Sequence, residues 1–351
     1  MKQIRSSIKQ LKHYFVIQDP DMIKLNQNES PFDIPEELKN EIWKNFQKIE
    51  WNRYPAFYPK KLIDTISGII DYPSYGIVAG NGSSELIQIT LASFCSAGDT
   101  VSLITPGFLL YSRIAAVLGL EINSIPLKEN FKFDVESIIE NSQASDILVL
   151  INPNNPTGTV LNYDETEEII KNLDIPIILD EAYYEFYDID TLSLLHKYEN
   201  LMIIRTFSKA LGLAGLRIGY LLAKPEYADH IEKAKLIFTV DSFQQIAGEL
   251  MFTKRNLVKK AVETIKKERN KVFDGLKNIK NIKPVPSHTN FIFFKVKGKS
   301  AAYVTKKLEQ RKILVRYAPK PVIEDYIRVT IGTSEENDIF LKNLTEIMEK
   351  E

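Results

Sequence analysis

Hydrophobic positions between about residues 76 and 245 alternate between short continuous runs and helical spacing. The continuous runs predict buried strands at residues 77–79, 101–104, 147–151, 175–179, 201–204 and 218–222. Between several of these runs the apolar residues follow a helical period, as in residues 85–94 and 165–171. Strand–helix alternation of this kind predicts an α/β fold with a mostly parallel sheet that helices cover on both faces.

The two ends of the chain have a different pattern. Residues 35–49 predict a helix with Pro35 in its first turn, and one stripe of this helix carries Leu38, Ile42, Phe46 and Ile49. In the last third, a long charged helix over residues 255–277 precedes strands predicted at 289–296, 313–316 and 326–331. Helices predicted at 300–310 and 334–350 flank these strands, which favours a smaller α+β domain joined by the N-terminal segment.

These patterns divide the chain into three parts. Residues 1–45 form an N-terminal arm and part of the small domain, residues 46–245 the large domain, and residues 246–351 the small C-terminal domain. A length of 351 residues suits this division, because each domain can bury a core of its own.

Composition and charge narrow the classes of function. A formal net charge of −1 argues against a nucleic-acid surface, which is normally strongly basic. Cys95 is the only cysteine, so no intrachain disulfide can form, and the four histidines lie far apart, so we expect no metal site. No apolar run approaches the length of about eighteen residues that spans a membrane, and residues 1–5 do not begin a signal peptide. We therefore expect a cytoplasmic protein without nucleic-acid or membrane partners.

The segment around Lys209 carries the most informative chemistry. A predicted strand ends just before Lys209, and a turn rich in glycine and alanine follows. A lysine whose pKa is lowered by burial can condense with an aldehyde such as pyridoxal phosphate. Arg217, further along the segment, could pair with the phosphate as a charge-assisted fork. A solvated surface lysine would also fit, since the chain has 45 lysine and arginine residues.

Residues 80–85, Gly-Asn-Gly-Ser-Ser-Glu, follow a predicted strand and precede a predicted helix. Glycines let a backbone approach a ligand, and the free N–H groups at the start of a helix favour an anion. An ordinary serine-capped helix would have the same sequence. The spacing differs from the glycine fingerprint of dinucleotide-binding proteins, which argues against a nicotinamide dehydrogenase.

Two polar segments follow other predicted strands, at the edge where open α/β sheets bind ligands. Residues 152–158 read Asn-Pro-Asn-Asn-Pro-Thr-Gly, and Asp180 follows the next strand. A carboxylate there could keep a pyridine nitrogen protonated, which makes pyridoxal an electron sink. The same residues would also form an ordinary turn and a helix cap.

Taken together, these motifs resemble those of the fold-type I pyridoxal-phosphate aminotransferases, and within them the histidinol-phosphate aminotransferase branch. The matching segments run in family order over most of the chain, at residues 25–29, 52–55, 82–85, 154–158, 180–183, 206–217, 289–291 and 327–332. The resemblance implies an α/β fold in which a large domain has a mostly parallel seven-stranded sheet between helices, beside a smaller α+β domain. It also implies pyridoxal 5'-phosphate as the cofactor.

The resemblance assigns roles around the cofactor. Lys209 matches the Schiff-base lysine. Once the substrate has freed this lysine from the cofactor, the lysine also acts as the acid and base that moves the substrate Cα proton. Asp180 matches the partner of the pyridine nitrogen, Asn155 and Tyr183 match the groups that bond the ring oxygen, and Phe108 matches the aromatic that stacks on the ring. The phosphate-binding residues implied by the resemblance are Ser83, Ser84, Thr206, Ser208 and Arg217.

The resemblance also concerns the partner subunit and the substrate. It implies a homodimer in which Tyr54 reaches the phosphate in the neighbouring active site. Arg328 matches an arginine that clamps a substrate anion, Arg316 could add a second charge, and Asn28 would lie at the entrance. A surface ion pair would also explain either arginine. Phe238 departs from the branch, which has a tyrosine near the substrate there, and this difference bears on the substrate rather than on the cofactor.

The expected reaction is the conversion of L-histidinol phosphate and 2-oxoglutarate to imidazole-acetol phosphate and L-glutamate in L-histidine biosynthesis, by a ping-pong route through pyridoxamine phosphate. A decarboxylase of a phosphorylated hydroxy-amino acid such as threonine phosphate, or an aromatic amino acid aminotransferase, would share the scaffold. A regulator that uses the scaffold as a sensor would need a DNA-binding domain, and the sequence before residue 25 is too short for one.

Overall fold

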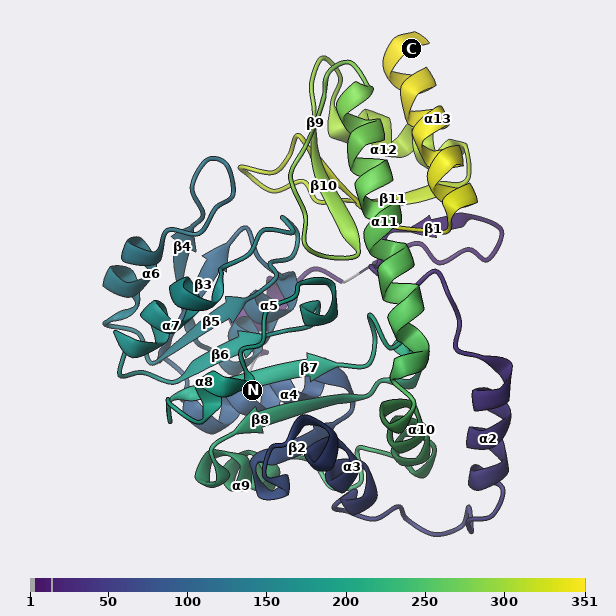
Figure 1. The fold of residues 1–351 in the computed structure, drawn as a ribbon. Helices are drawn as coiled ribbons and strands as arrows, with labels where there is room; N and C mark the ends of the chain where they lie inside the picture. Colours follow the sequence, from purple (N-terminus) through teal and green to yellow (C-terminus); the bar gives the residue numbers. More distant parts are fainter. Residues whose placement is uncertain (1–3, 14, 351) are drawn as a thin grey trace.

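The computed structural model describes residues 4–13 and 15–350. In Figure 1 the larger domain fills the lower part of the molecule and the smaller domain lies above it, with the long helix α11 (Asn256–Asn278) running from one to the other. Within the described residues, no helix has the length and apolar character needed to cross a membrane.

The larger domain is built on a seven-stranded sheet with the strand order β2-β8-β7-β6-β5-β3-β4. Its strands are β2 (Ile77–Gly80), β3 (Thr100–Thr105), β4 (Glu121–Pro126), β5 (Ile147–Ile151), β6 (Ile177–Asp180), β7 (Leu201–Thr206) and β8 (Gly219–Ala223). Strand β8 is antiparallel to both of its neighbours, and every other pair in this sheet is parallel. The predicted α/β fold with a mostly parallel seven-stranded sheet is confirmed.

Helices cover both faces of this sheet, because successive strand residues point to opposite sides. On β7, Ile203 belongs to one core, whereas Met202 and Ile204 belong to the other. The first core is covered by α2 (Glu36–Phe46), α3 (Lys60–Ile70), α6 (Val135–Ser142), α7 (Tyr163–Lys171), α8 (Leu192–Leu195) and α10 (Ser242–Thr253). The second is covered by α4 (Gly82–Phe94), α5 (Leu109–Leu118) and α9 (Pro225–Ala234), and the short α1 (Ser6–Lys9) lies against α5.

The smaller domain has a five-stranded sheet with the order β1-β11-β12-β10-β9. Its strands are β1 (Ile23–Leu25), β9 (Ile282–Pro284), β10 (Phe291–Val296), β11 (Ile313–Tyr317) and β12 (Tyr326–Thr330). Strand β1 pairs in parallel with β11, so the N-terminal segment completes this sheet. Residues of α11, α12 (Ala301–Gln310) and α13 (Ser334–Lys350) contribute to the core of this domain.

Some elements differ from the sequence-based expectations. Strand β4 was not predicted, because it is an edge strand with mainly exposed positions and no continuous apolar run. Pro35 precedes α2 as its N-cap instead of lying in its first turn, because its backbone is extended (φ −54°, ψ 141°). Helix α2 ends at Phe46, which leaves Ile49 outside it.

Helices at both predicted edges of the large domain pack into its core. Leu38 and Ile42 of α2 belong to the first core of the large sheet, and so do Met251 and Phe252 of α10. These residues lie outside the predicted range 46–245, and the domain boundaries themselves stay a prediction.

Candidate active site

Three neighbouring parallel strands end at one edge of the large sheet and bring their polar residues together. Ile151 at the end of β5 is aligned with Asp180 at the end of β6, and Asp180 is aligned with Ile204 on β7. The polar loop of residues 152–158 and the segment that carries Lys209 therefore leave the sheet beside Asp180. This is the carboxyl edge at which open α/β sheets bind ligands.

Asp180 is a buried carboxylate with only 3% of its surface exposed. The hydroxyl of Tyr111 donates a hydrogen bond of 2.9 Å to it, and the backbone N–H of Ala182 donates another of 3.1 Å. Burial raises the pKa of Asp180 to about 6, and these two hydrogen bonds only partly oppose that effect. A cationic group placed against this carboxylate would favour its charged form.

Tyr111 is a site residue that the sequence did not identify. It lies on α5 one helical turn after Phe108, which is the N-cap residue of that helix. The Phe108 ring lies edge-on to the Tyr111 ring at a centroid distance of 6.5 Å, and Tyr111 in turn contacts Asp180. No sequence signal linked Tyr111 to Asp180, because an aromatic residue three positions after Phe108 on this helix has the pattern of an ordinary core position.

The amine of Lys209 lies in the same site and is half-buried. Its Nζ donates a hydrogen bond of 3.0 Å to the carbonyl of Gln27. Burial lowers the pKa of Lys209 to about 7, and the positive charge of Arg328 lowers it further, whereas Glu29 and Asp180 act in the opposite direction. The amine is therefore substantially neutral near pH 7, as a nucleophile toward an aldehyde must be.

Two glycines let Arg217 lie against the first turn of α4. A Cβ on Gly82, which has a φ of +76°, would lie 2.6 Å from Nη2 of Arg217, and a Cβ on Gly219 would lie 2.6 Å from the backbone nitrogen of Ser83. Nη1 of Arg217 also donates a hydrogen bond of 3.2 Å to the Ser208 hydroxyl. The guanidinium, this hydroxyl and the start of α4 therefore lie together.

The same cluster contains the remaining predicted phosphate residues. The Thr206 hydroxyl donates to the Ser208 hydroxyl at 3.0 Å, and it also accepts from the Ser208 backbone N–H. Ser83 and Ser84 lie in the first turn of α4, where backbone N–H groups have no partner within the helix. A helix start, hydroxyl groups and one guanidinium fit a phosphate group, and Asp180 and Lys209 fit the pyridine nitrogen and the aldehyde of pyridoxal phosphate.

Arg328 connects the smaller domain to this site. Its Nη1 donates a hydrogen bond of 2.7 Å to the side-chain oxygen of Asn155, and its Nη2 donates one of 2.8 Å to the carbonyl of Asn26. The Tyr183 hydroxyl accepts from the side-chain amides of Asn28 at 2.9 Å and of Asn155 at 3.4 Å. The structure thus brings four of the predicted residues into one network.

Arg316 lies directly opposite Arg328 across the β11–β12 pair, so the two side chains share one face of the small sheet. Both side chains are half-buried. Two like charges opposite each other destabilise a sheet on their own. An anion between or beside them would relieve that repulsion.

Tyr54 is the predicted residue that lies apart from this cluster in the single chain. It is 82% exposed, and its ring stacks on that of Phe238 with centroids 4.6 Å apart and planes 14° apart. Among the described residues it has no hydrogen bond to the phosphate cluster.

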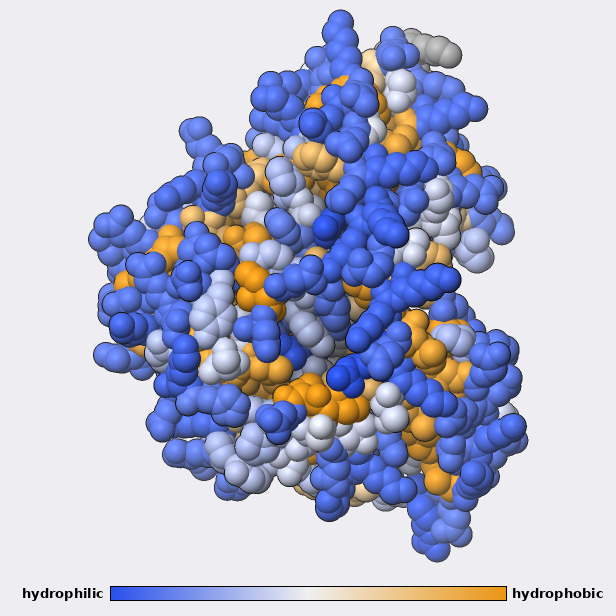
Figure 2. Space-filling model, in the orientation of Figure 1, coloured by the Kyte–Doolittle hydropathy of each residue, from blue (hydrophilic) through white to orange (hydrophobic). Residues whose placement is uncertain are grey.

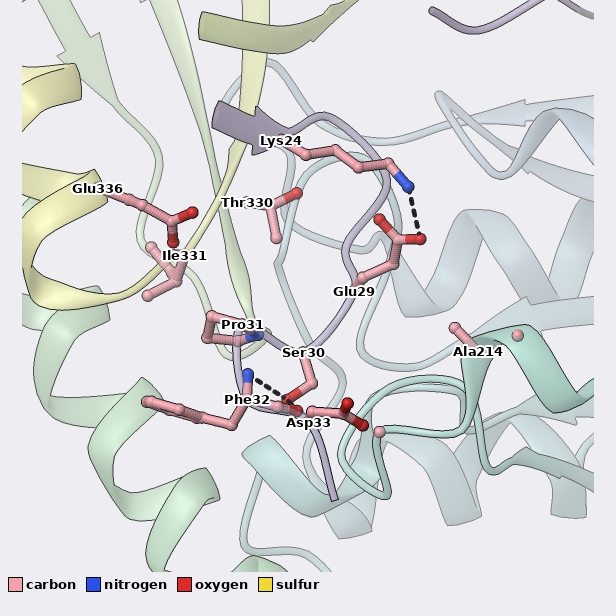
Figure 3. Close-up of a pocket in the computed structure, with 13 residues that line it drawn as sticks. Lys24, Glu29, Ser30, Pro31, Phe32, Asp33, Ala214, Thr330, Ile331 and Glu336 are labelled. Carbon is pink, nitrogen blue, oxygen red and sulfur yellow. Dashed lines mark hydrogen bonds and ion pairs between the residues drawn. The ribbon is translucent and has the colours of Figure 1, made fainter. Parts of the chain in front are cut away.

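A pocket of about 380 Å³ lies between the segment that follows β1, the turn after Lys209 and the connection between β12 and α13. Figure 3 shows Lys24 and Glu29 pointing toward each other at this pocket, where they form an ion pair of 2.8 Å. Glu29 also raises the pKa of Lys209, so the pocket adjoins the site. In the part of the chain that the structure describes, no cluster of His, Cys, Asp and Glu residues could hold a metal ion.

A buried carboxylate, a lysine amine and a phosphate-binding cluster at the carboxyl edge of a mostly parallel seven-stranded sheet place the molecule among the fold-type I aminotransferases. More narrowly, the chain belongs to the family of class I and II aminotransferases, whose family model matches residues 20–344. The predicted family and fold class are thereby confirmed.

Three similar proteins are described as histidinol-phosphate aminotransferases. A histidinol-phosphate aminotransferase of Clostridium kluyveri is 35% identical over 93% of this chain and 93% of its own length. The crystal structure of the histidinol-phosphate aminotransferase from Clostridium acetobutylicum has a TM-score of 0.88 and 25% identity, and the match covers 94% of this chain and all of that one. That of the enzyme from Sinorhizobium meliloti, in complex with pyridoxal-5'-phosphate, has a TM-score of 0.90 and 22% identity over 99% of this chain and 98% of that one, which supports the fold.

The first prediction concerns the lowered pKa of Lys209. In the cofactor-free protein, the rate at which Lys209 captures added pyridoxal phosphate should rise with pH and level off above about pH 7, because only the neutral amine attacks the aldehyde. Stopped-flow absorbance measures this rate, and a Lys209→Ala variant is the blank. Arg328→Gln should move the midpoint upward, because it removes a positive charge that lowers the pKa. A midpoint near the ordinary lysine value of 10.5 would contradict the prediction.

The second prediction concerns the raised pKa of Asp180. Because the folded protein holds the Asp180 proton up to about pH 6 and the unfolded chain releases it near 3.8, the charged carboxylate opposes folding above pH 6. Asp180→Asn should therefore raise the free energy of unfolding of the cofactor-free protein at pH 7.5 by on the order of 2 kcal/mol, with a smaller gain at pH 5. Urea unfolding measures both values. Asp174→Asn, at an exposed position outside the helices and strands, is the control and should change neither.

Proposed function

We propose that this protein is a pyridoxal-phosphate-dependent aminotransferase that converts L-histidinol phosphate and 2-oxoglutarate to imidazole-acetol phosphate and L-glutamate. The observation that carries the substrate proposal is the pair of arginines, Arg316 and Arg328, aligned opposite each other on the small sheet, with the charge of Arg328 acting on Lys209. One substrate of this reaction presents a phosphate and the other presents carboxylates, and the planar fork of an arginine binds either group. Curated relatives that are 35% and 36% identical over more than nine-tenths of the chain carry this activity in their names.

Pyridoxal phosphate, when bound, supplies a ring that accepts electrons from the substrate carbon. Lys209 would hold the cofactor through its amine, and the same amine, once free, would take up and return the proton of the substrate α-carbon. Its pKa of about 7 suits this work, because a proton carrier is most effective when its pKa lies near the working pH. Asp180 would pair with the ring nitrogen and favour its protonated form, and the Tyr111 hydroxyl fixes the orientation of that carboxylate.

Other residues orient the two ends of the cofactor. Asn155 and Tyr183 would bond the ring oxygen, and Phe108 would stack on the ring face. The phosphate is bound by the cluster described above, which consists of Ser83, Ser84, Thr206, Ser208 and Arg217. Since the phosphate does not react, this cluster contributes by fixing the position of the ring.

In the substrate pocket, Arg328 clamps the anionic end of each substrate in turn. Its guanidinium is already oriented by Asn155 and by the carbonyl of Asn26, so little side-chain freedom is lost on binding. Asn28 lies beside this clamp and is held by Thr330, whose hydroxyl accepts from the Asn28 backbone N–H at 2.9 Å. Arg316 supplies the second positive charge.

The active form is proposed to be a homodimer in which Tyr54 of one protomer reaches the phosphate of the other. Large apolar side chains near Tyr54 in the sequence are unusually exposed, including Trp51 at 63% and Phe57 at 42%, and so are Leu236 at 72% and Ile237 at 69%. Figure 2 also shows hydrophobic surface on the side where α2 and α10 lie. Exposed apolar surface of this kind marks an interface. A cytoplasmic location is proposed as well, since a single cysteine needs no oxidising compartment.

A panel of amino donors tests the proposed reaction. With 2-oxoglutarate as acceptor, kcat/KM for L-histidinol phosphate should exceed that for phenylalanine and for unphosphorylated L-histidinol by at least about tenfold, because only the phosphate engages both arginines. Coupled detection of L-glutamate measures each rate. Equal or faster turnover of phenylalanine would replace the proposal with an aromatic aminotransferase. Release of carbon dioxide from threonine phosphate, without consumption of the oxo acid, would replace it with a decarboxylase.

Mixing two inactive variants tests the shared site. Lys209→Ala removes the reactive amine of its own protomer, and Tyr54→Ala removes a phosphate contact from the neighbouring one. After subunit exchange, half of the dimers should be mixed and each should hold one intact site, so roughly a quarter of the wild-type activity should return. Activity no greater than the mean of the two separate variants would contradict sharing of Tyr54. Size-exclusion chromatography with light scattering checks that both variants remain dimeric.

A further inference from the structure

Arg217 holds its guanidinium in place from a backbone conformation that is unfavourable for arginine. Its φ of 52° and ψ of 62° lie in the left-handed region, which costs an L-residue other than glycine about 1 kcal/mol or more. A residue stays in this conformation only when its surroundings hold it there. The groups that hold the peptide on either side of Arg217 therefore matter for the position of its side chain.

Gln244 on α10 fixes the peptide groups on either side of Arg217. Its side chain is buried, with 7% of its surface exposed. The amide nitrogen lies 2.9 Å from the carbonyl oxygen of Leu216 and 2.9 Å from that of Arg217. The same nitrogen lies 2.9 Å from the side-chain oxygen of Asn81, the N-cap residue of α4, so three acceptors share its two hydrogens.

A single amide group thus connects the two segments that form the phosphate cluster. Asn81 begins the helix whose first turn carries Ser83 and Ser84, and the two carbonyls belong to the turn that presents Arg217. The segment just before α10 touches the same helix start a second time. The hydroxyl of Thr239 donates to Glu85 at 3.1 Å, and Glu85 in turn accepts from the backbone N–H of Asn81.

Gln244 also closes the start of its own helix. Its side-chain oxygen accepts from the backbone N–H of Asp241 at 2.6 Å, and the Asp241 carboxylate accepts from the backbone N–H of Gln244 at 2.8 Å. This capping box fixes the Gln244 side chain before any ligand binds. Its amide is therefore a rigid tether rather than an adaptable contact.

We propose that Gln244 is a positioning residue for the cofactor phosphate, which sets the distance between the Arg217 guanidinium and the first turn of α4. This inference rests on the proposed phosphate-binding role of Arg217. The amide nitrogen of Gln244 bonds Asn81 and the backbone carbonyls of Leu216 and Arg217, so Gln244 acts on the phosphate cluster through these groups. Its effect must therefore depend on the phosphate, and the aldehyde and ring of the cofactor should be insensitive to it.

Comparison of two aldehydes isolates this effect. Pyridoxal phosphate and pyridoxal share the ring and the aldehyde, and only the first carries the phosphate. For the cofactor-free wild-type protein and each variant, titration followed by absorbance and intrinsic fluorescence gives both dissociation constants, and their ratio measures the preference for the phosphate. In Gln244→Met, which keeps the length of the side chain and removes its donors, the ratio should fall by about tenfold while the affinity for pyridoxal changes less than about twofold.

Gln244→Glu separates the tether from the helix cap. A glutamate keeps the oxygen that accepts from Asp241, loses the donors to the two carbonyls and adds a negative charge, so its ratio should fall at least as far. Asn200→Ala is the matched control, because the Asn200 amide also donates to two backbone carbonyls, those of Leu173 and Ile175, away from the phosphate cluster. It should leave the ratio unchanged.

An unchanged ratio in Gln244→Met, or an equal loss of affinity for both aldehydes, would overturn the positioning role. So would a wild-type ratio in Gln244→Glu beside a low ratio in Gln244→Met, since the helix cap would then be the cause. If wild-type protein itself showed no preference for the phosphorylated aldehyde, the proposed phosphate role of Arg217 would fail together with this inference. An intact wild-type preference with unaffected variants overturns the inference alone.

Discussion

The parallel register of β5, β6 and β7 is the constraint from which the site follows. Because β6 lies between two strands that end beside it, Asp180 leaves the sheet at a point enclosed on both sides. A carboxylate there loses its hydration, and the hydrogen bonds from Tyr111 and from the Ala182 backbone restore only part of it. The same burial that costs stability makes the position selective for a cation, since a nearby positive group restores the stabilisation of the charged carboxylate that is lost with its hydration. The site is thus prepared electrostatically before any ligand arrives.

Burial has the opposite consequence for the amine at the same edge. The pKa of Asp180 rises to about 6 and that of Lys209 falls to about 7, and desolvation is the largest cause of both shifts. Their mutual attraction affects both pKa values less than burial does, so the two groups behave as separately desolvated residues more than as an ion pair. Arg328 adds to the effect on Lys209 from the smaller domain. Since Arg328 is held by Asn155 of the larger domain, the acidity of the lysine depends on how the two domains meet.

Sequence patterns identified the parts of this site that lie at the ends of apolar strands. Lys209, Asp180 and the glycine–serine turn at residues 82–84 could be predicted, because a hydrophobic run followed by polar residues marks the edge of a buried sheet. Tyr111 could not, since it reaches Asp180 from 69 positions away in the sequence and its helix has the pattern of an ordinary core element. Gln244 could not be predicted for the same reason, because the pattern of an amphipathic helix does not show which backbone carbonyls a polar side chain on that helix will contact. Strand β4 was not predicted because its positions are mostly exposed.

The reason for one motif also changes when its surroundings are known. Glycines before a helix suggest a backbone that a ligand approaches closely, and the sequence at residues 80–85 invites that interpretation. In the fold, the missing Cβ of Gly82 makes room for the Arg217 guanidinium, and the missing Cβ of Gly219 makes room for the backbone of Ser83. These glycines therefore allow two segments of the chain to pack closely against each other, instead of allowing a ligand to approach the backbone. They bring a guanidinium and a helix start close enough to bind one anion together, and the left-handed conformation of Arg217 is part of the cost of that arrangement.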